Sequence, residues 1–327
     1  MRYRPLGRTG FDVSAIGFGA WAIGGSWGPV HDEESLSTLR RALELGVNFF
    51  DTADVYGDGH SEQLLARLRR EQKQPFRVAT KVGRRSNPHV ASAYTRKNLT
   101  AYVDRCLTNL ETEALDLVQL HCPPTDVYYM PEVFDLFDEL VKVGKVLHYG
   151  ASVERVEEAL KAIEYPGVES IQIVFNVFRQ RPAERLFELC KKQGVGVIAR
   201  LPLSSGLLTG KLRSDTQFAA DDHRAFNRAG AAFDRGETFS GVDYELGLSV
   251  AKELEALVPP GWTLAELSLA WILSHDAVST AIPGARRVAQ VEENTRAAER
   301  PPLSPETLCK IAEIYGARIR PEVHQRW

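Results

Sequence analysis

The chain contains few cysteines and no long apolar segment. Its four cysteines, Cys106, Cys122, Cys190 and Cys309, form no CxxC pair and no regular framework. This pattern excludes a small disulfide-stabilised fold and favours free thiols in a reducing compartment. No segment has the pattern of a signal peptide, and no apolar run reaches the length of a membrane span. We therefore expect a cytoplasmic protein without membrane contact.

The chain also lacks a large excess of charge of either sign. Its formal net charge is −3 and its pI is about 6.3, which gives no general attraction for nucleic acid or for an anionic membrane. Hydrophobic residues make up 44% and charged residues 25%, the balance of a globular protein with a large core. A length of 327 residues fits one α/β barrel, so we expect a single domain over 1–327, as a monomer or a homo-oligomer.

Several catalytic motifs are missing. The sequence has no HxxxH or CxxC spacing, so no metal site is predicted, although His121 and Cys122 are adjacent. GxSxG is absent, and the serines at 204–206 therefore do not indicate a hydrolase nucleophile. The nearest match to the dinucleotide-binding GxGxxG is GFGAWA at 17–22, which lacks the last glycine.

The chain does contain a regular alternation of short β-rich runs with amphipathic helical stretches. Most of the runs are continuously apolar, as is typical of parallel strands covered on both faces. Among the helices, one is expected to be capped by Asp32 and to end at Gly46. Thr263 and Glu266 predict a capping box at the start of another. The eight runs cover residues 15–19, 48–51, 76–81, 115–121, 146–152, 170–175, 195–200 and 279–283.

Eight strands alternating with helices admit two folds, a closed barrel and an open doubly wound sheet. An open sheet that binds a dinucleotide would need the missing GxGxxG motif, so a (β/α)8 TIM barrel is favoured. Residues 2–14 lie outside the repeat and predict a β-hairpin that closes the bottom of the barrel. Residues 204–243, after the seventh strand, are long and polar with four scattered phenylalanines. They predict a loop that covers a bound cofactor.

Three titratable residues end consecutive predicted strands: Asp51, Lys81 and His121, with Tyr56 shortly after Asp51. Chemistry in barrel enzymes takes place at the carboxyl ends of the strands. A carbonyl that accepts hydride needs a proton, which a tyrosine can donate if a nearby ammonium lowers its pKa. A carboxylate keeps that ammonium charged, and an imidazole aligns the carbonyl oxygen. Each residue alone has an ordinary interpretation, such as a turn cap, a solvated strand end or a buried histidine, and only their coincidence favours chemistry.

At these residues the chain resembles the aldo-keto reductase superfamily, over essentially its whole length. The resemblance implies a (β/α)8 barrel with a catalytic tetrad of Asp51, Tyr56, Lys81 and His121, in which Tyr56 donates the proton. It implies reduction of aldehydes or ketones to alcohols, or the reverse, with NADP(H) bound in an extended pose across the barrel mouth. The segments that carry the resemblance are GVNFFDTADVYG at 46–57 with Ser61-Glu62, LGRTG at 6–10, GFGAW at 17–21, LDLVQLH at 115–121 and IPGA at 282–285.

The resemblance also indicates where the cofactor would bind. Ser152 and Gln172 match residues that bond the nicotinamide carboxamide, and Lys211 matches a loop that wraps the pyrophosphate. Arg286 or Arg287 precedes a helix whose N-terminus favours anions, which argues for a 2′-phosphate and for NADP over NAD. A solvated arginine pair is the alternative. The expected cofactor positions are Gly19, Ala20, Trp21, Ser152, Gln172, Arg200, Leu203, Gly206, Leu208, Lys211, Gly284, Arg286, Gln290, Glu293 and Asn294.

Two positions near the expected nicotinamide depart from the family pattern. Val153 follows Ser152 where the family usually has asparagine, so one contact is missing or is supplied elsewhere. Arg200 replaces the aromatic residue that commonly stacks on the nicotinamide. Its guanidinium plane can stack on a ring, but its charge would disfavour the positive, oxidised form, so Arg200 is predicted to change cofactor affinity or redox preference. Cys122 is expected to be a small packing residue rather than a redox centre.

Aromatic side chains are expected to form the substrate pocket, namely Trp21, Trp27 and Tyr56, and such a pocket suits a range of small aldehydes and ketones. The leading hypothesis is an NADP(H)-dependent carbonyl reductase. A cofactor-sensing regulatory subunit with slow turnover is one alternative, because potassium-channel beta subunits share the fold and the tetrad. A metal-dependent barrel hydrolase is another, and it would require a bound metal.

Overall fold

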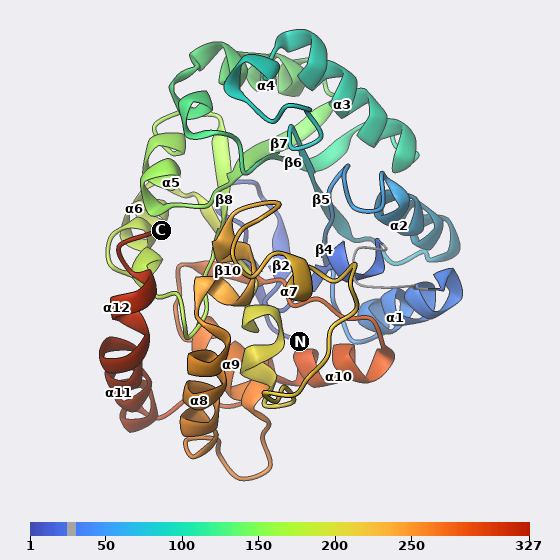
Figure 1. The fold of residues 1–327 in the computed structure, drawn as a ribbon. Helices are drawn as coiled ribbons and strands as arrows, with labels where there is room; N and C mark the ends of the chain where they lie inside the picture. The colour runs from blue at the N-terminus through green and yellow to red at the C-terminus, as the bar shows by residue number, and fades with distance from the viewer. Residues whose placement is uncertain (25–30) are drawn as a thin grey trace.

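A closed barrel of eight parallel strands forms the centre of the molecule, in a computed structural model that describes residues 1–24 and 31–327 (Figure 1). The sheet order runs from β10 through β9, β8, β7, β6, β5 and β4 to β3, so each strand lies beside the next one along the chain. The barrel strands are β3 (Phe18–Gly19), β4 (Phe49–Asp51), β5 (Arg77–Val82), β6 (Leu115–His121), β7 (Val146–Ser152), β8 (Val168–Val174), β9 (Gly196–Arg200) and β10 (Val278–Ala281).

The first and last strands meet and close the ring. The Gly17 amide donates a hydrogen bond to the Ala281 carbonyl at 2.8 Å, and Ile16 forms a parallel bridge with Ala281. A second parallel bridge joins Gly19 to Gly284. The predicted barrel is therefore confirmed over the open sheet. Every predicted run overlaps a strand, although the first, 15–19, is regular strand only at its end.

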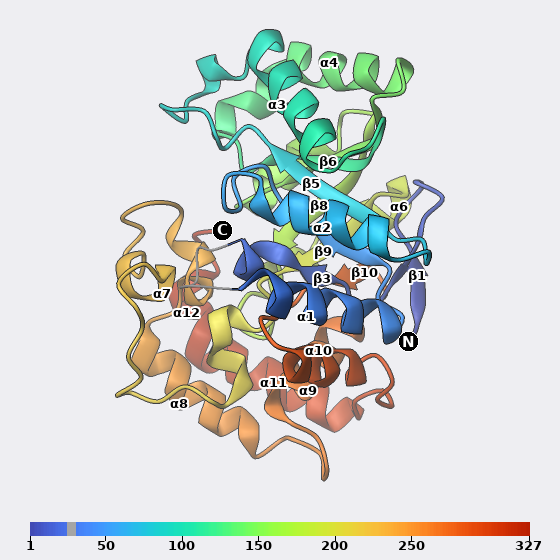
Figure 2. The ribbon, with the colours of Figure 1, turned by 90° about the vertical axis from the view of Figure 1, so that its right-hand side faces the viewer.

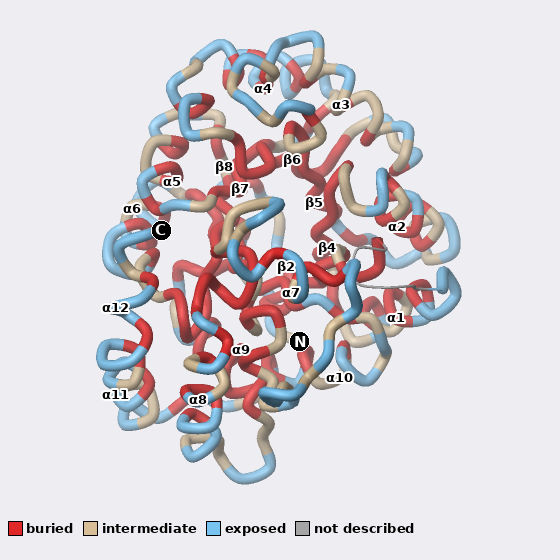
Figure 3. The backbone as a smooth tube through the Cα atoms, viewed as in Figure 1, coloured by how far each residue is buried: buried red, intermediate tan, exposed pale blue. Residues whose placement is uncertain are grey.

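Helices cover the outside of the barrel, and the interface between the two layers is buried (Figure 3). Strand β6 is buried at every position, because one face points into the barrel and the other faces helices. The helices are α1 (Asp32–Glu44), α2 (His60–Glu71), α3 (Arg96–Asn109), α4 (Pro131–Lys142), α5 (Val156–Ala162), α6 (Leu186–Gln193), α7 (His223–Phe226), α8 (Tyr244–Glu255), α9 (Leu264–Leu273), α10 (Val288–Arg296), α11 (Pro305–Ile314) and α12 (Arg320–Val323).

The helix ends test two sequence predictions. The capping box of α9 is present: the Thr263 hydroxyl accepts from the Glu266 amide at 3.2 Å, and the Thr263 amide donates to the Glu266 carboxylate at 2.9 Å. The prediction that Asp32 caps α1 was wrong, because the cap position belongs to His31 and Asp32 is the first helical residue. There its carboxylate still lies at the positive end of the helix dipole.

An antiparallel hairpin closes the bottom of the barrel, as predicted for residues 2–14. Strands β1 (Tyr3–Pro5) and β2 (Asp12–Ser14) pair with Tyr3 opposite Ser14. Leu6 and Val13 are fully buried against the side chains that fill the barrel interior from below, which include Phe49 and Leu117. Figure 2 shows this hairpin at one end of the molecule and α7 at the other.

The segment 204–243 lies over the opposite, carboxyl end of the strands (Figure 1). It is made of short turns of helix: η5 (Ser204–Thr209), α7, η6 (Arg235–Glu237) and η7 (Phe239–Gly241). Its aromatic side chains pack within the segment and on the barrel rim. Phe233 and His223, for example, contact the Trp21 ring, with centroid distances of 6.1 and 4.7 Å. We call residues 204–243 the covering segment.

Candidate active site

The four residues of the predicted tetrad lie together in one cavity of about 330 Å³ at the carboxyl end of the barrel. Asp51 ends β4, Lys81 lies near the end of β5, and His121 ends β6, while Tyr56 comes from the turn after β4. The strand register accounts for part of this grouping, because Asp51 pairs with Ala79, two residues before Lys81, and Lys81 pairs with Gln119, two residues before His121. The sequence prediction that these side chains meet is thus consistent with the geometry.

An ion pair between Lys81 and Asp51 forms the base of the cavity. The ammonium nitrogen of Lys81 lies 2.6 Å from Asp51 Oδ2 and 2.7 Å from the carbonyl oxygen of Thr52, and both charged side chains are almost completely buried. The same nitrogen lies 3.4 Å from Tyr56 Oη. Burial alone would lower the pKa of Lys81, but Asp51 and Tyr56 raise it, and the net shift is upward. Lys81 is therefore a cation fixed beside the phenol.

Two glutamines hold Asp51 from the other side, a contact that the sequence analysis missed. The Gln172 amide donates to Asp51 Oδ1 at 2.7 Å, and the Gln119 amide does so at 3.4 Å. Gln119 lies two residues before His121 on β6, and alternate residues of a strand face the same side. That spacing was available in the sequence. Gln172 therefore orients the tetrad carboxylate in addition to lining the cavity.

Burial, rather than Lys81, dominates the protonation of Tyr56. Burial raises the pKa of the Tyr56 phenol, Lys81 lowers it, Asp51 raises it, and the net direction is upward. The Lys81 ammonium does lower the pKa of Tyr56, as expected from the sequence, but the increase caused by desolvation is larger. The phenol consequently keeps its proton at neutral pH, which is the form that can donate it.

His121 is a neutral imidazole. Burial lowers its pKa well below the usual value, and the positive charges of Arg84 and Lys81 lower it further. Its ring meets the Tyr56 ring edge to face, with centroids 5.9 Å apart. Nε2 lies 3.4 Å from an Arg84 nitrogen, and Nδ1 is buried without a hydrogen-bond partner among the described residues. Because a guanidinium only donates, this contact needs the lone pair on Nε2.

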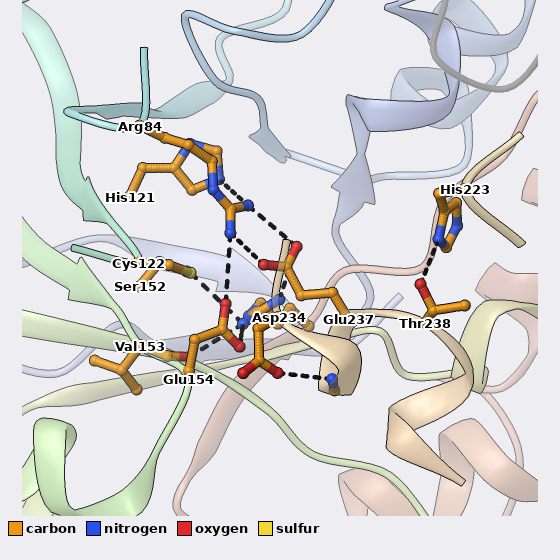
Figure 4. Close-up of polar contacts among 12 residues, drawn as sticks. Arg84, His121, Cys122, Ser152, Val153, Glu154, His223, Asp234, Glu237 and Thr238 are labelled. Carbon is orange, nitrogen blue, oxygen red and sulfur yellow. Dashed lines mark hydrogen bonds and ion pairs between the residues drawn. The ribbon is translucent and has the colours of Figure 1, made fainter. Parts of the chain in front are cut away.

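Four charged side chains, two of them buried and two partly buried, form a cluster beside His121, and we call them the charge cluster. Figure 4 labels Arg84, Glu154 and Glu237 of this cluster. Its members are Arg84, two residues after β5; Glu154, two after β7; Arg200, at the end of β9; and Glu237, in the covering segment. Arg84 binds both oxygens of Glu237, one of them at 3.1 Å. Arg200 lies 2.8 Å from Glu154 and 3.7 Å from Glu237. Of the four, only Arg200 was predicted from the sequence, because the others come from loops with no motif.

The contacts of Arg200 within the charge cluster differ from those expected from the sequence. The sequence suggested a cation acting directly on the nicotinamide, whereas its Nη2 atom donates to Glu154 and, at 3.1 Å, to the Val153 carbonyl. Burial raises the pKa of Glu154 to about 8, against the opposite influence of Arg200. The pKa of Glu237 is held well below its usual value, because Arg84 and Arg200 outweigh the effect of burial. The charge of Arg200 is therefore partly neutralised by its surroundings.

Cys122 also adjoins this cluster. Its sulfur lies 3.6 Å from Arg200 Nη2 and 3.5 Å from Ser152 Oγ. Its ligand atom and those of Glu154 and Glu237 lie within 4.8 Å of one another, a spacing that a metal ion can use. Two guanidinium groups already pair these carboxylates, so an additional cation would meet like charge. Burial raises the pKa of the Cys122 thiol, which disfavours the reactive thiolate.

The cavity continues from the tetrad toward α10 as a groove that contains most of the predicted cofactor positions. Two of them, Ala20 and Leu208, have fully buried side chains and are not part of the described lining. Trp27, expected in the substrate pocket, lies outside the described residues. The positions that do line the cavity are Gly19, Trp21, Ser152, Gln172, Arg200, Leu203, Gly206, Lys211, Gly284, Arg286, Gln290, Glu293 and Asn294.

The chemistry of this groove fits an extended, anionic cofactor. Two cationic side chains lie at its α10 end, Lys211, which contacts Glu293 of α10, and Arg286, which precedes α10, and Arg224 of α7 also lines the cavity. Lys211 is held by Glu293 at 2.7 Å but remains 64% exposed, so its ammonium can still approach a phosphate. At the rim, a Cβ atom on Gly19 would lie 2.8 Å from the Ile282 carbonyl, so only glycine fits there.

Similarity to known proteins identifies the family of this chain. The model of the aldo/keto reductase family matches residues 15–316. The chain belongs to the aldo/keto reductase family. It is 30% identical over 311 residues to the uncharacterized oxidoreductase YqkF of Bacillus subtilis, covering 94% of each chain. It is 29% identical to a probable voltage-gated potassium channel subunit beta of Arabidopsis thaliana, covering 99% of this chain and 100% of that one.

Two further similar proteins are a relative whose name includes a cofactor and a protein of solved structure. The chain is 27% identical to the aldo-keto reductase yakc of Schizosaccharomyces pombe, whose name specifies NADP(+), over 97% of this chain and 95% of that one. The solved glycerol dehydrogenase of Gluconobacter oxydans superposes with a TM-score of 0.80 at 27% identity, covering 97% of this chain and 96% of that one. Because this chain belongs to the aldo/keto reductase family, it is an oxidoreductase. No helix in the described part is long and apolar enough to cross a membrane.

Proposed function

We propose that this protein reduces aldehydes or ketones to alcohols, or catalyses the reverse reaction, with NADP(H) as the hydride carrier. One observation carries the proposal: Tyr56 Oη lies 3.4 Å from a buried ammonium that is itself paired with Asp51 at 2.6 Å. A phenol beside a fixed cation, in a cavity that is continuous with a cationic groove, suits proton donation to a carbonyl that accepts hydride.

In this mechanism, Tyr56 donates its proton to the carbonyl oxygen as negative charge develops there. The Lys81 ammonium, held in place by Asp51, stabilises the phenolate that remains. Neutral His121 lines the same cavity and adds no second acid. To align the carbonyl oxygen it would carry its proton on Nε2, in the tautomer that gives up the contact with Arg84. A reduced nicotinamide held in the groove would supply the hydride. In the alcohol-oxidising direction Tyr56 accepts the proton instead.

The proposed cofactor contacts follow the groove. Ser152 and Gln172 would hold the nicotinamide end, and Lys211 the pyrophosphate. Arg286 lines the other end of the cavity, before α10, where a guanidinium and a helix N-terminus would both favour the 2′-phosphate of NADP. The relative whose name specifies NADP(+) supports the same choice. The carbonyl substrate is a small molecule.

A regulatory subunit is the second candidate, because the similarity to a probable potassium channel subunit beta covers the whole chain. Such a protein would keep its cofactor bound and turn over slowly. The distinction can be made by comparing the rate of carbonyl reduction with the rate of cofactor release from the same preparation.

The proposed function is tested by following NADPH absorbance at 340 nm with a panel of aldehydes and ketones, and by repeating the panel with NADH. Reduction of at least some carbonyls, with preference for NADPH, is the expected result. Retention of NADPH through repeated buffer exchange, with slow turnover, would favour the regulatory candidate. Absence of reduction with either cofactor would contradict the proposal.

A further inference from the structure

The indole of Trp327, which follows α12, is buried against the covering segment, although Trp327 and its partner there are 93 positions apart in the chain. Figure 2 shows this part of the chain beside the covering segment. The Trp327 Nε1 atom donates to Asp234 Oδ1 at 2.8 Å, and the same oxygen accepts from the Gly236 amide at 2.6 Å. Asp234 therefore joins the indole to the turn that carries Glu237 (Figure 4).

Two glycines of the covering segment make room for the indole ring. A Cβ atom on Gly241 would overlap the ring, and one on Gly236 would lie 2.9 Å from a ring carbon, closer than real Cβ atoms approach. The Arg179 guanidinium lies 4.3 Å from the ring centroid, within the range of a cation–π contact. Arg179 also donates to the Ser240 carbonyl at 3.3 Å. The indole of Trp327 thus fills a space between the covering segment and the loop after β8.

The backbone beside this indole is strained. Phe239 and Ser240 have φ values of 52° and 59°, in the left-handed region that residues with a Cβ atom seldom adopt. Such a conformation persists only where the surroundings fix it. The Asn176 side-chain amide donates to Ser240 Oγ at 2.8 Å, and the Phe239 amide donates to Ser205 Oγ at 3.1 Å. The turn is held by contacts from outside it, so losing those of Trp327 should favour its release.

The same turn forms part of the wall of the proposed cofactor groove. Glu237 lines the cavity and accepts from Arg84 of the barrel rim at 3.1 Å. Ser205 and Gly206, at the start of the covering segment, line the cavity as well. Trp327 does not belong to this described lining. Any effect of the indole on a bound cofactor must therefore pass through the turn at 234–241.

We propose that Trp327 is a positioning residue that holds the covering segment over the cofactor, and that its contact with Asp234 controls how fast NADP(H) leaves. The assignment rests on the proposed function and concerns cofactor release from the same site. The indole takes no part in proton or hydride transfer. Its loss should therefore shorten the time that the cofactor stays bound and leave the chemical step unchanged.

The substitution Trp327→Phe tests the assignment, because it keeps an aromatic ring beside the two glycines and removes the N–H donor. The NADPH complex is mixed with a large excess of NADP+, and the loss of bound NADPH fluorescence gives the release rate. We expect release about tenfold faster than in wild type, since a hydrogen bond to a carboxylate is lost. Aldehyde reduction in a single turnover with saturating NADPH should stay within about twofold. Release at the wild-type rate would overturn the assignment.

A matched control and a double variant separate positioning from a general loss of stability. Trp271→Phe changes another buried indole, in α9, whose ring contacts Phe175 and His275. It should lower thermal stability without accelerating NADPH release. If Trp327 acts through Asp234, adding Trp327→Phe to Asp234→Ala should leave release within about twofold of Asp234→Ala alone. Multiplied effects of the two substitutions would overturn the assignment, as would equally fast release from the Trp271 variant.

A measurement without cofactor separates this assignment from the proposed function. Amide hydrogen exchange is followed in the cofactor-free protein, where the Gly236 and Phe239 amides donate to side chains. Trp327→Phe should make exchange across 234–241 about tenfold faster and leave β6 unchanged. Unchanged exchange at 234–241 would overturn the assignment even if carbonyl reduction stands. If wild type binds neither NADPH nor NADH, the proposed function fails, and the control of cofactor release fails with it.

Discussion

The ammonium nitrogen of Lys81 lies 2.6 Å from the Asp51 carboxylate and 3.4 Å from the Tyr56 hydroxyl. This geometry makes the lysine a fixed positive charge rather than a proton donor, because Asp51 and Tyr56 raise its pKa against the effect of burial. Its expected contribution is to stabilise the phenolate that forms when Tyr56 gives up its proton.

The first prediction concerns the substitution Lys81→Met. Lys81 lowers the pKa of Tyr56, so its removal should raise that pKa further. Reduction needs the protonated phenol, and its rate falls as pH rises through the pKa of Tyr56. The alkaline limb of kcat/KM should therefore move to higher pH, while the plateau falls about a hundredfold. Lys145→Met, at an exposed ion pair with Asp104, is the control. A limb that stays in place in the Lys81 variant would refute this role.

The second prediction concerns Asp54, whose carboxylate oxygens are buried without hydrogen-bond partners among the described residues. Burial, with Glu62 and Asp58, raises the pKa of Asp54 to about 7 against the opposing charges of Arg85 and Arg105. The folded state thus holds a proton that the unfolded state releases above about pH 4, so unfolding becomes easier as pH rises toward 7. The loss of stability is at most about 1.4 kcal/mol per pH unit.

Asp54→Asn should remove this pH dependence. We expect the free energy of unfolding of the variant, relative to wild type, to increase between pH 5 and pH 8. Urea unfolding at the two pH values measures it, with the exposed Asp126→Asn as control. An identical difference between Asp54→Asn and wild type at both pH values would rule out a shifted carboxyl at this position.

The third prediction separates the two arginines before α10. Arg286 lines the cavity, whereas the Arg287 side chain is 79% exposed and lies 3.8 Å from Glu34. Arg286→Ala should weaken NADPH binding about tenfold or more and leave NADH binding nearly unchanged, since only NADPH has the 2′-phosphate. Arg287→Ala should affect neither. Isothermal titration of both cofactors decides between them, and equal loss of NADPH and NADH affinity in Arg286→Ala would contradict the assignment.

The fourth prediction concerns Arg200→Tyr. Removing a cation from the nicotinamide end should favour the positive, oxidised cofactor, so the ratio of NADP+ to NADPH affinity should rise. Because Glu154 and Glu237 already pair with Arg200, we expect a change of only roughly three- to tenfold. Arg96→Tyr, on an exposed ion pair with Glu139, controls for the added aromatic ring. Direct binding measurements with both redox forms test this, and an unaltered ratio would exclude an electrostatic role.

The fold, and the meeting of the four side chains proposed as a tetrad, could be predicted from the sequence because strand ends carry strong local signals. Apolar runs ending in Asp51, Lys81 and His121 predict neighbouring positions once the strands are parallel and adjacent. The capping box at Thr263 was equally local. The error at Asp32 arose because His31, which lacks the usual capping side chain, occupies the cap position.

The charge cluster could not be predicted from the sequence in the same way. Arg84, Glu154 and Glu237 lie in loops, and Glu237 meets Arg84 across 153 positions of the chain. No periodicity or spacing connects such residues, since their contact depends on how the covering segment packs over the barrel. The protonation of Tyr56 was misjudged for a related reason: burial outweighs the ammonium, and burial of one side chain depends on the whole packed structure.

The most direct test of the account is the substitution Tyr56→Phe, measured in a single turnover with enzyme in excess over NADPH and a saturating aldehyde. The change removes only the hydroxyl, so NADPH affinity should stay within about twofold of wild type. We predict that the rate of NADPH oxidation falls by about 100- to 10,000-fold, the usual contribution of a positioned acid. Oxidation at the wild-type rate with cofactor binding intact would contradict the assignment of Tyr56 as the proton donor and, with it, the proposed mechanism.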